Sequence, residues 1–175
     1  MAVYLSIPII NELVRLVDIS TYEDSVHAMG SAILNYYFPV ANGYAVIPGE
    51  HRGDKTITEF NIIRIERRFP GDRSVVEHTT VKATKAADWL ISLSEQLEDD
   101  LWSTNPECGR CWVIIILGPT FRFYEYHLHR PKNKRVIPWG PPNQQQQNSF
   151  HVHHDCITID WMLRHMAQND APPVR

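Results

Sequence analysis

The stretch RSVVEHTTVKATKAADWLISLSEQLEDDLW (residues 73–102) changes its periodicity half-way along, and this change decides the fold class. Its first part is rich in valine and threonine, which is typical of a β-strand. From Thr84 onward leucines recur at helical spacing on one face, while acidic residues lie on the others. We therefore expect a strand followed by a long amphipathic helix. The strand carries one carboxylate, Glu77, at its centre.

Both flanks of this stretch add strands and helices. Before it, helical spacing predicts helices over 7–18 and 20–38, and alternation predicts strands around 44–47 and over 55–69. After it, the apolar run CWVIIIL (111–117) is expected to be a central strand buried on both faces, with FRFYEYH (121–127) as its hairpin partner. The Pro-, Gly- and Gln-rich segment 130–149 is expected to be a connector without regular structure over its length. Residues 150–168 are expected to form a short strand and a final helix.

This order predicts an α/β fold with a mixed central sheet of about five strands flanked by helices. The 175 residues suit a single domain, 1–175, with a core over about 8–127 and a C-terminal extension, 128–175, that holds a loop and the final helix. A chain of this size buries a core without disulfide or metal support, and its three cysteines cannot all pair.

Composition narrows the class of protein. A formal net charge of −3 excludes a protein that coats nucleic acid through bulk positive charge, so nucleic-acid binding would need a local patch. No apolar stretch has the length needed to span a bilayer, and the N-terminus lacks the features of a signal peptide. Scarce cysteines fit a reducing compartment. We therefore expect an intracellular location, cytoplasmic or nuclear, and no membrane partner.

The element order, with carboxylates on the second and third strands, resembles the PD-(D/E)XK nuclease superfamily, which has the restriction-endonuclease-like fold. The resemblance covers roughly residues 12–127. It implies a metal-dependent phosphodiesterase that cleaves nucleic acid with Mg²⁺ or Mn²⁺, because hard cations take oxygen ligands and activate a bound water. The stretches RCWVIIILGPTFRFYEYH and VIPWGPPN also resemble short proteins of filamentous fungi, a likeness that implies no activity.

The resemblance to the nuclease superfamily also implies site residues. Glu77 matches the acid of the third-strand motif, Glu59 or Asp54 the second-strand Asp, and Glu12 or Glu23 the helical acid. The implied metal ligands are therefore Glu23, Asp54, Glu59 and Glu77. Gln96 with Leu97 resembles the helical Gln-Leu of the exonuclease branch, and Lys82 or Lys85 would stabilise the charge that develops on the phosphate. The implied catalytic set is Glu59, Glu77, Lys82, Lys85 and Gln96.

The sequence departs from this pattern at the lysine. The superfamily places it two residues after the acid, on the same strand face, but Thr79 stands there. By strict alternation Lys82 has the opposite parity to Glu77, and Lys85 would have to reach back from the following helix. The usual proline before the second-strand acid is also absent. These departures favour an alternative, a catalytically inactive nuclease-like scaffold that binds a protein or nucleic-acid partner. A third alternative, a small enzyme of secondary metabolism, has no sequence feature that specifies its substrate.

Glu77 itself allows two interpretations. Either it faces a polar cleft shared with the neighbouring strand, or its strand lies near a sheet edge. In the second case Glu77 meets water or pairs with Arg64 or Arg73 across strands.

The cysteines and histidines allow a zinc hypothesis. Cys108-Gly109-Arg110-Cys111 has the spacing of half a zinc site, and the remaining ligands would come from the segment HVHHDC (His151, His153, His154 and Cys156). Because no second CxxC exists, we favour the interpretation in which Cys111 begins the buried strand and Cys108 lies in the loop before it. His151 and His153 are expected on one strand face, as exposed residues, and Asp155 and Asp160 as turn and helix-cap residues.

Basic residues gather at two expected hairpins. One group is Arg64, Arg67, Arg68 and Arg73, and the other is His129, Arg130, Lys132, Lys134 and Arg135. Either group has the charge to contact phosphates. Charges at hairpin tips also deter unwanted strand pairing, which is the commoner reason for them.

Overall fold

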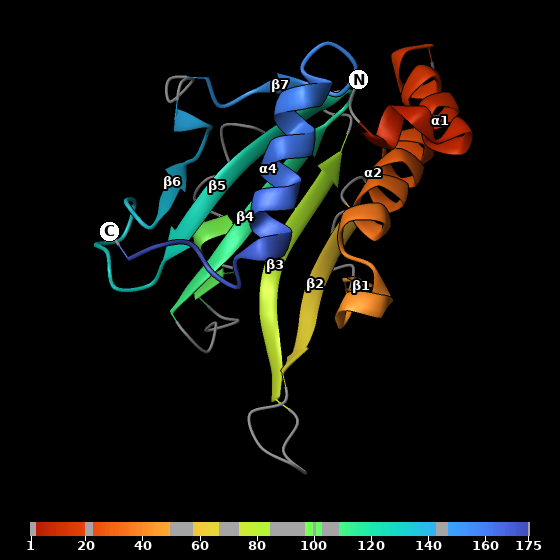
Figure 1. Ribbon diagram of the computed structural model, residues 1–175. Helices are drawn as coiled ribbons and strands as arrows, with labels where there is room; N and C mark the ends of the chain where they lie inside the picture. Colours follow the sequence, from red (N-terminus) through yellow and green to blue (C-terminus); the bar gives the residue numbers. More distant parts are fainter. Residues whose placement is uncertain are drawn as a thin grey trace.

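The computed structural model of the chain shows a β-sheet flanked by helices (Figure 1). It describes residues 3–19, 23–49, 58–66, 74–84, 97–99, 101–102, 109–142 and 147–174. The helical elements are η1 (Val3–Ser6), α1 (Pro8–Ile19), α2 (Glu23–Tyr37), η2 (Val40–Asn42) and α4 (Cys156–Gln168). The strands are β1 (Tyr44–Pro48), β2 (Thr58–Glu66), β3 (Ser74–Thr84), β4 (Arg110–Leu117), β5 (Thr120–His127), β6 (Val136–Pro138) and β7 (Phe150–His151). Residues 97–99 and 101–102 are also helical.

The sheet has the strand order β1-β2-β3-β4-β5-β6, and β7 pairs with β5. Only the β3–β4 pair is parallel among the described pairs, and the others are antiparallel. The prediction of a mixed sheet flanked by helices is confirmed. The sheet has seven strands rather than about five, because the short β6 and β7 also join it. β6 lies inside the segment that was expected to lack regular structure.

The apolar run at the centre of the sheet behaves as predicted. Residues 111–116 of β4 are buried one after another, because β3 and β5 flank this strand and side chains cover both of its faces. The β4–β5 hairpin turns at Gly118, whose φ of 54° lies in the left-handed region that glycine adopts without a Cβ clash.

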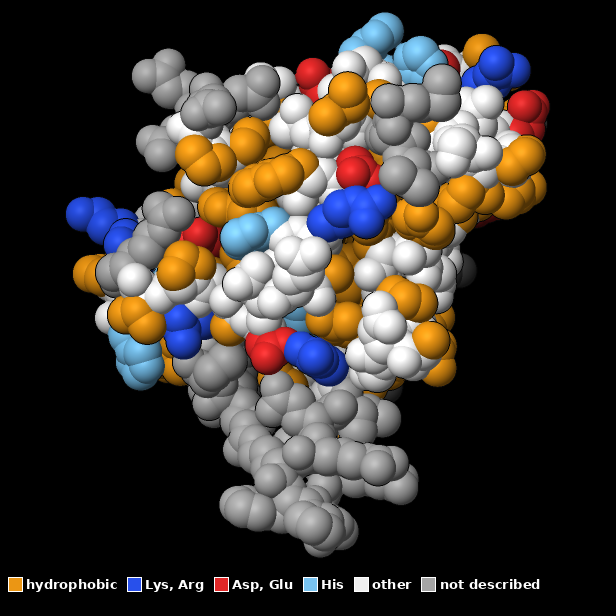
Figure 2. Space-filling model, in the orientation of Figure 1, with side chains coloured by type: hydrophobic (Ala, Val, Ile, Leu, Met, Phe, Trp, Pro, Cys, Tyr) orange, Lys and Arg blue, Asp and Glu red, His pale blue; other side chains and the backbone are white. Residues whose placement is uncertain are grey.

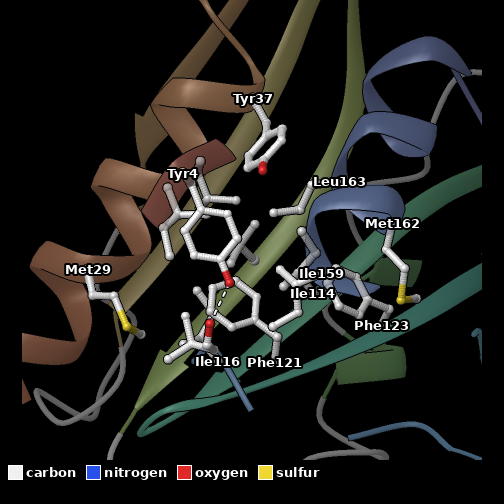
Figure 3. Close-up of a cluster of buried hydrophobic side chains, with 14 of the residues drawn as sticks. Tyr4, Met29, Tyr37, Ile114, Ile116, Phe121, Phe123, Ile159, Met162 and Leu163 are labelled. Carbon is white, nitrogen blue, oxygen red and sulfur yellow. Dashed lines mark hydrogen bonds between the residues drawn. The ribbon is translucent and has the colours of Figure 1, made fainter. Parts of the chain in front are cut away.

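Helices α1, α2 and α4 lie over one face of the sheet and enclose the main core (Figure 1). α1 contributes a stripe at helical spacing, Ile10, Val14 and Val17. In Figure 3, Ile159, Met162 and Leu163 of α4 lie near the strand side chains Ile114, Ile116, Phe121 and Phe123. The hydroxyl of the buried Tyr4 donates a hydrogen bond to the carbonyl of Val152. The core thus includes the C-terminal helix and extends beyond the 8–127 region expected from the sequence.

The opposite sheet face carries a smaller apolar cluster. Leu97 and Leu101 of the helical residues pack against Cys111, Val113 and Ile115 of β4 and against Tyr126 of β5. The leucine stripe from which the helix was predicted therefore does bury its described members.

A β-bulge interrupts β3 next to Glu77. Ile62 of β2 is opposite Thr79, whereas Ile63 is opposite Glu77, so His78 is one extra residue in the ladder. A bulge of this kind shifts the alternation of the strand by one position. Side chains of β3 before and after His78 therefore alternate between the two sheet faces in opposite order, which changes the face of Glu77 relative to Lys82.

Candidate functional site

The register brings two of the predicted site residues directly opposite each other. Glu59 of β2 pairs with Lys82 of β3 in the antiparallel ladder. Lys82 is 2% exposed. A buried ammonium is tolerated only when compensating groups surround it. Directly opposite positions in such a ladder bring their Cβ atoms to within about 5 Å of each other.

The same register separates the two predicted metal-binding glutamates. Glu77 is opposite Ile63, which lies four residues along β2 from Glu59. At about 3.3 Å per residue the two backbone positions lie roughly 13 Å apart along the sheet. Two ligands of one Mg²⁺ each lie about 2.1 Å from the ion, so their oxygens must approach within roughly 4 Å. The register therefore does not by itself bring Glu59 and Glu77 to one ion, because both side chains would have to extend toward each other along the strands.

The bulge corrects the parity expected for Lys82. Arg64, opposite Val76, contacts the ring of Tyr44 on the helix-covered face, so Val76 also lies on that face and Glu77 on the other. Val81 and Ala83 belong to the core under the helices, which puts Lys82 on the other face as well. The expectation of opposite faces was wrong, because strict alternation does not allow for an inserted residue.

Glu77 is partly exposed and lies in a stretch of β3 that pairs with β2 alone in the described ladders, since pairing with β4 starts at Thr79. Arg64, one partner considered for it, is on the other face and forms an ion pair with Asp170. Arg73, the second, lies outside the described residues. This placement favours the second interpretation of Glu77, in which its strand lies near a sheet edge.

Position 79, where the superfamily has its lysine, belongs to a structural anchor. Thr79 is buried, and its hydroxyl lies 2.7 Å from Nδ1 of His78. Nε2 of His78 lies 3.0 Å from the carbonyl of Met166, near the end of α4. Because a carbonyl only accepts, Nε2 carries the proton and Nδ1 accepts from Thr79. Burial lowers the pKa of His78 to about 4, so the ring is neutral near pH 7.

The sheet in this way caps the last turn of α4. The final carbonyls of a helix have no partner within the helix. Here His78 donates to Met166, the Tyr44 hydroxyl donates to Ala167 over 2.9 Å, and the Trp112 indole donates to Asn169 over 2.9 Å. The centre of β3 therefore holds a helix end in place, which is a role that the sequence reasoning missed.

Several predicted residues cannot be placed in a site. Asp54, Lys85 and Gln96 lie outside the described residues. Glu23 is the first residue of α2, with no described side chain, and Glu12 is exposed on α1. Among the side chains that the structure does describe, no three His, Cys, Asp or Glu residues are grouped as metal ligands.

The cysteine and histidine predictions have mixed outcomes. Cys111 is a buried residue at the start of β4, as favoured, whereas Cys108 lies outside the described residues. The expectation that His151 and His153 share a strand face was wrong, because β7 ends at His151 and the chain then turns. Nδ1 of His151 instead accepts the backbone N–H of His153.

Asp155 and Asp160 also differ. Asp155 stands at the N-cap of α4, and its carboxylate accepts the backbone N–H of His151, which fits the expected turn. The expectation of a helix cap was wrong for Asp160, which lies inside α4. There it accepts hydrogen bonds from the Tyr37 hydroxyl and from Arg164, and so joins α4 to α2.

A buried acid–base pair on β5 was not predicted. Glu125 is fully buried, and its carboxylate lies 3.0 Å from Nε2 of His127, which is 5% exposed. The two lie opposite Trp112 and Arg110 of β4. The alternation of FRFYEYH already puts Glu125 and His127 on the face of Phe121 and Phe123, so a signal for burial was present in the sequence.

Charge is scattered over the surface that Figure 2 shows. Lys and Arg side chains occur singly or next to acidic ones, and no broad basic patch lies on this face. Arg164 and Arg64, for example, are each paired with a carboxylate.

Comparison with known proteins gives no family, no curated protein and no solved structure that matches this chain. In the part of the chain that the structure describes, no helix is long and apolar enough to cross a membrane.

Proposed function

We propose that the chain is a binding protein on a nuclease-like scaffold, one that recognises a partner and does not cleave nucleic acid. The observation that carries this proposal is the register between β2 and β3. It sets Glu59 and Glu77 four positions apart along the ladder, a backbone spacing that argues against a shared metal ion. The order of three strands, a helical segment and two strands supports the scaffold part of the proposal.

The residues around the expected lysine position support the same conclusion. Thr79 and His78 are buried and hold the end of α4, and Lys82 is almost completely covered. A lysine that stabilises charge on a phosphate has to reach that phosphate. At this site the described side chains serve packing and helix capping.

A protein is the favoured partner class. The chain carries a formal net charge of −3, and the face in Figure 2 mixes acidic and basic side chains. Binding to nucleic acid draws most of its free energy from neutralised phosphates, which requires a concentrated basic surface. Protein interfaces have no such requirement.

The test is a cleavage assay with Mg²⁺ or Mn²⁺ on single- and double-stranded DNA and RNA. We expect no metal-dependent cleavage by the wild-type chain. Metal-dependent cleavage that is lost in Glu59→Gln and in Lys82→Met, but retained in Arg122→Gln, would overturn the proposal. Arg122 is the matched control, since it is a basic residue of β5 on the same sheet face as Lys82.

One observation favours a second candidate, a divergent metal-dependent phosphodiesterase centred on Glu59 and Lys82. Their positions are directly opposite on neighbouring strands, and Mg²⁺ in proteins often keeps several waters and only one or two carboxylate ligands. Glu77 would then have no role in catalysis. Cleavage that survives Glu77→Ala but not Glu59→Gln is the outcome that distinguishes this candidate from the site implied by the resemblance.

A further inference from the structure

A short segment that bends at Asp170 and Ala171 follows α4 and is held against the sheet. Residues 169–173, which we call the strap, leave the last turn of the helix and run toward the start of β4 (Figure 1, dark blue). The strap belongs to neither the helix nor the sheet. It is held by side chains of β2 and β4, and these define the strap site as Arg64, Arg110 and Trp112.

The contacts at the strap site recognise a peptide backbone and one acid. The Trp112 indole donates to the carbonyl of Asn169, and the Arg110 guanidinium donates to the carbonyl of Pro172. Arg64 forms an ion pair with the carboxylate of Asp170. Any extended polypeptide offers such carbonyls, so specificity comes from the acid and from the proline two residues later.

The strap is weakly attached to the rest of the fold. Pro172 is its only buried residue, while Asn169, Asp170 and Pro173 are exposed. The side chains of Arg64 and Asp170 are 33% and 52% exposed, and ion pairs with this exposure add little to stability. Segments with few buried apolar contacts open locally at much lower free energy than the whole domain unfolds.

The surroundings of the strap site favour a peptide over a polyanion. Glu125, directly opposite Trp112, is a fully buried acid, and His127 is opposite Arg110. In the described contacts only one donor of the site, Arg64, meets a carboxylate, while Arg110 and Trp112 meet neutral backbone carbonyls, which fits a peptide with a single acid better than a run of phosphates. The two arginines and the indole are all donors, which suits carbonyl and carboxylate acceptors.

We propose that the strap is a displaceable occupant of a peptide-binding surface, and that the partner is a protein segment with an acidic residue followed two residues later by proline. This inference rests on the proposed function, that the fold binds a partner. In the free protein the strap fills the site in cis. A partner segment of the same chemistry replaces it in trans. The partner must therefore bind tightly enough to displace the strap.

The test uses a fluorescent peptide with the sequence QNDAPPVR, that of residues 168–175, and the full-length chain. The double variant Asp170→Ala, Pro172→Gly loosens the strap and leaves the strap site intact. In the wild type the strap covers the strap site in most molecules, so only a small fraction of the protein can bind the peptide. We therefore expect the variant to bind the peptide about tenfold or more tightly than the wild type. In that background Arg110→Gln should weaken binding by about tenfold or more, and Arg122→Gln, on the opposite sheet face, should leave it unchanged.

Equal binding by the two proteins, or none by either, overturns the proposal once circular dichroism shows both to be folded. Competition by an oligonucleotide at the same site overturns the assignment to a peptide. Wild-type dimers that the loosened variant lacks would assign the site to a second copy of the chain and also overturn it.

A second measurement on the wild type keeps the proposal testable if the variant fails to fold. Hydrogen exchange of the Asp170 and Ala171 amides should be at least about tenfold faster than that of buried amides in α4, through local opening of the strap. Equally slow exchange would refute a displaceable strap. Metal-dependent cleavage of nucleic acid would refute the proposed function but would leave the peptide-binding and hydrogen-exchange results unchanged. Failure of the proposed function can therefore be distinguished from failure of the strap proposal.

Discussion

Replacing His78 gives the sharpest test of how the sheet holds α4. The neutral ring donates to the carbonyl of Met166 and accepts from Thr79. His78→Gln keeps an N–H donor of similar reach and removes the titration. The substitution loses the ring contacts with Phe38 and Tyr44, so we expect the free energy of unfolding to fall by about 2 kcal/mol at pH 7.5.

The pH dependence of that difference follows from the pKa of His78. Burial lowers it in the folded protein to about 4, from an ordinary 6.5. Between these values the unfolded chain binds a proton that the folded chain does not, so the contribution of His78 is complete above pH 6.5 and is lost as the pH falls toward 4. At about 1.4 kcal/mol per pKa unit the full loss is about 3 kcal/mol.

The assay is urea unfolding of the wild type and of His78→Gln at several pH values from 7.5 to 4.5. Carboxylates that titrate in both proteins cancel in the difference between them. We expect the difference in unfolding free energy, wild type minus variant, to fall steadily below pH 6.5 and to change sign at about pH 5. Parallel curves for the two proteins would refute the assignment of a buried, neutral His78.

Three further substitutions test the packing of the fold by urea unfolding. Glu98→Ala should cost about 2 kcal/mol, because the buried Glu98 carboxylate accepts the backbone N–H of Asn133 at 2.9 and 3.0 Å; an unchanged midpoint would contradict this. Gly118→Ala should cost about 1 kcal/mol, since its φ of 54° disfavours a Cβ, and Gly118→Asn should cost less; equal losses would argue against the left-handed turn. Ile114→Ala, in the fully buried part of β4, should cost about 3 kcal/mol, whereas Ile157→Ala, 67% exposed, should stay within about 0.5 kcal/mol.

Periodicity predicted most of the described fold because its signal is strong over long elements. Every apolar position of the α1 stripe fits a helix, and every residue of the apolar run in β4 fits a buried strand. β6 and β7 were missed or only partly foreseen because strands of three and two residues are too short to show alternation. Their pairing with β5 depends on contacts distant in the chain.

The candidate site was harder to predict than the fold. The sequence pointed to Glu59 and Lys82, and the register puts them opposite each other. It did not reveal the bulge at His78, because one inserted residue leaves no mark in the composition of a strand. That insertion changes the face of Glu77 relative to Lys82, and the antiparallel register decides how far Glu77 lies from Glu59.

The role of His78 shows why side-chain function was not readable from the strand alone. A histidine beside a glutamate on a half-buried strand suggested a polar site. The partner of its ring is the carbonyl of Met166, which lies 88 positions away along the chain. Only the docking of α4 on the sheet brings the two together.

Titration of Mn²⁺ followed by electron paramagnetic resonance tests the central claim, that Glu59 and Glu77 do not share a metal ion. The wild type, Glu59→Gln and Glu77→Gln are compared under the same conditions. We predict that the two substitutions do not weaken Mn²⁺ binding together, and that Glu77→Gln changes it by less than about twofold. Loss of one tight Mn²⁺ site in both variants, by about tenfold or more in each, would contradict the register on which the account rests.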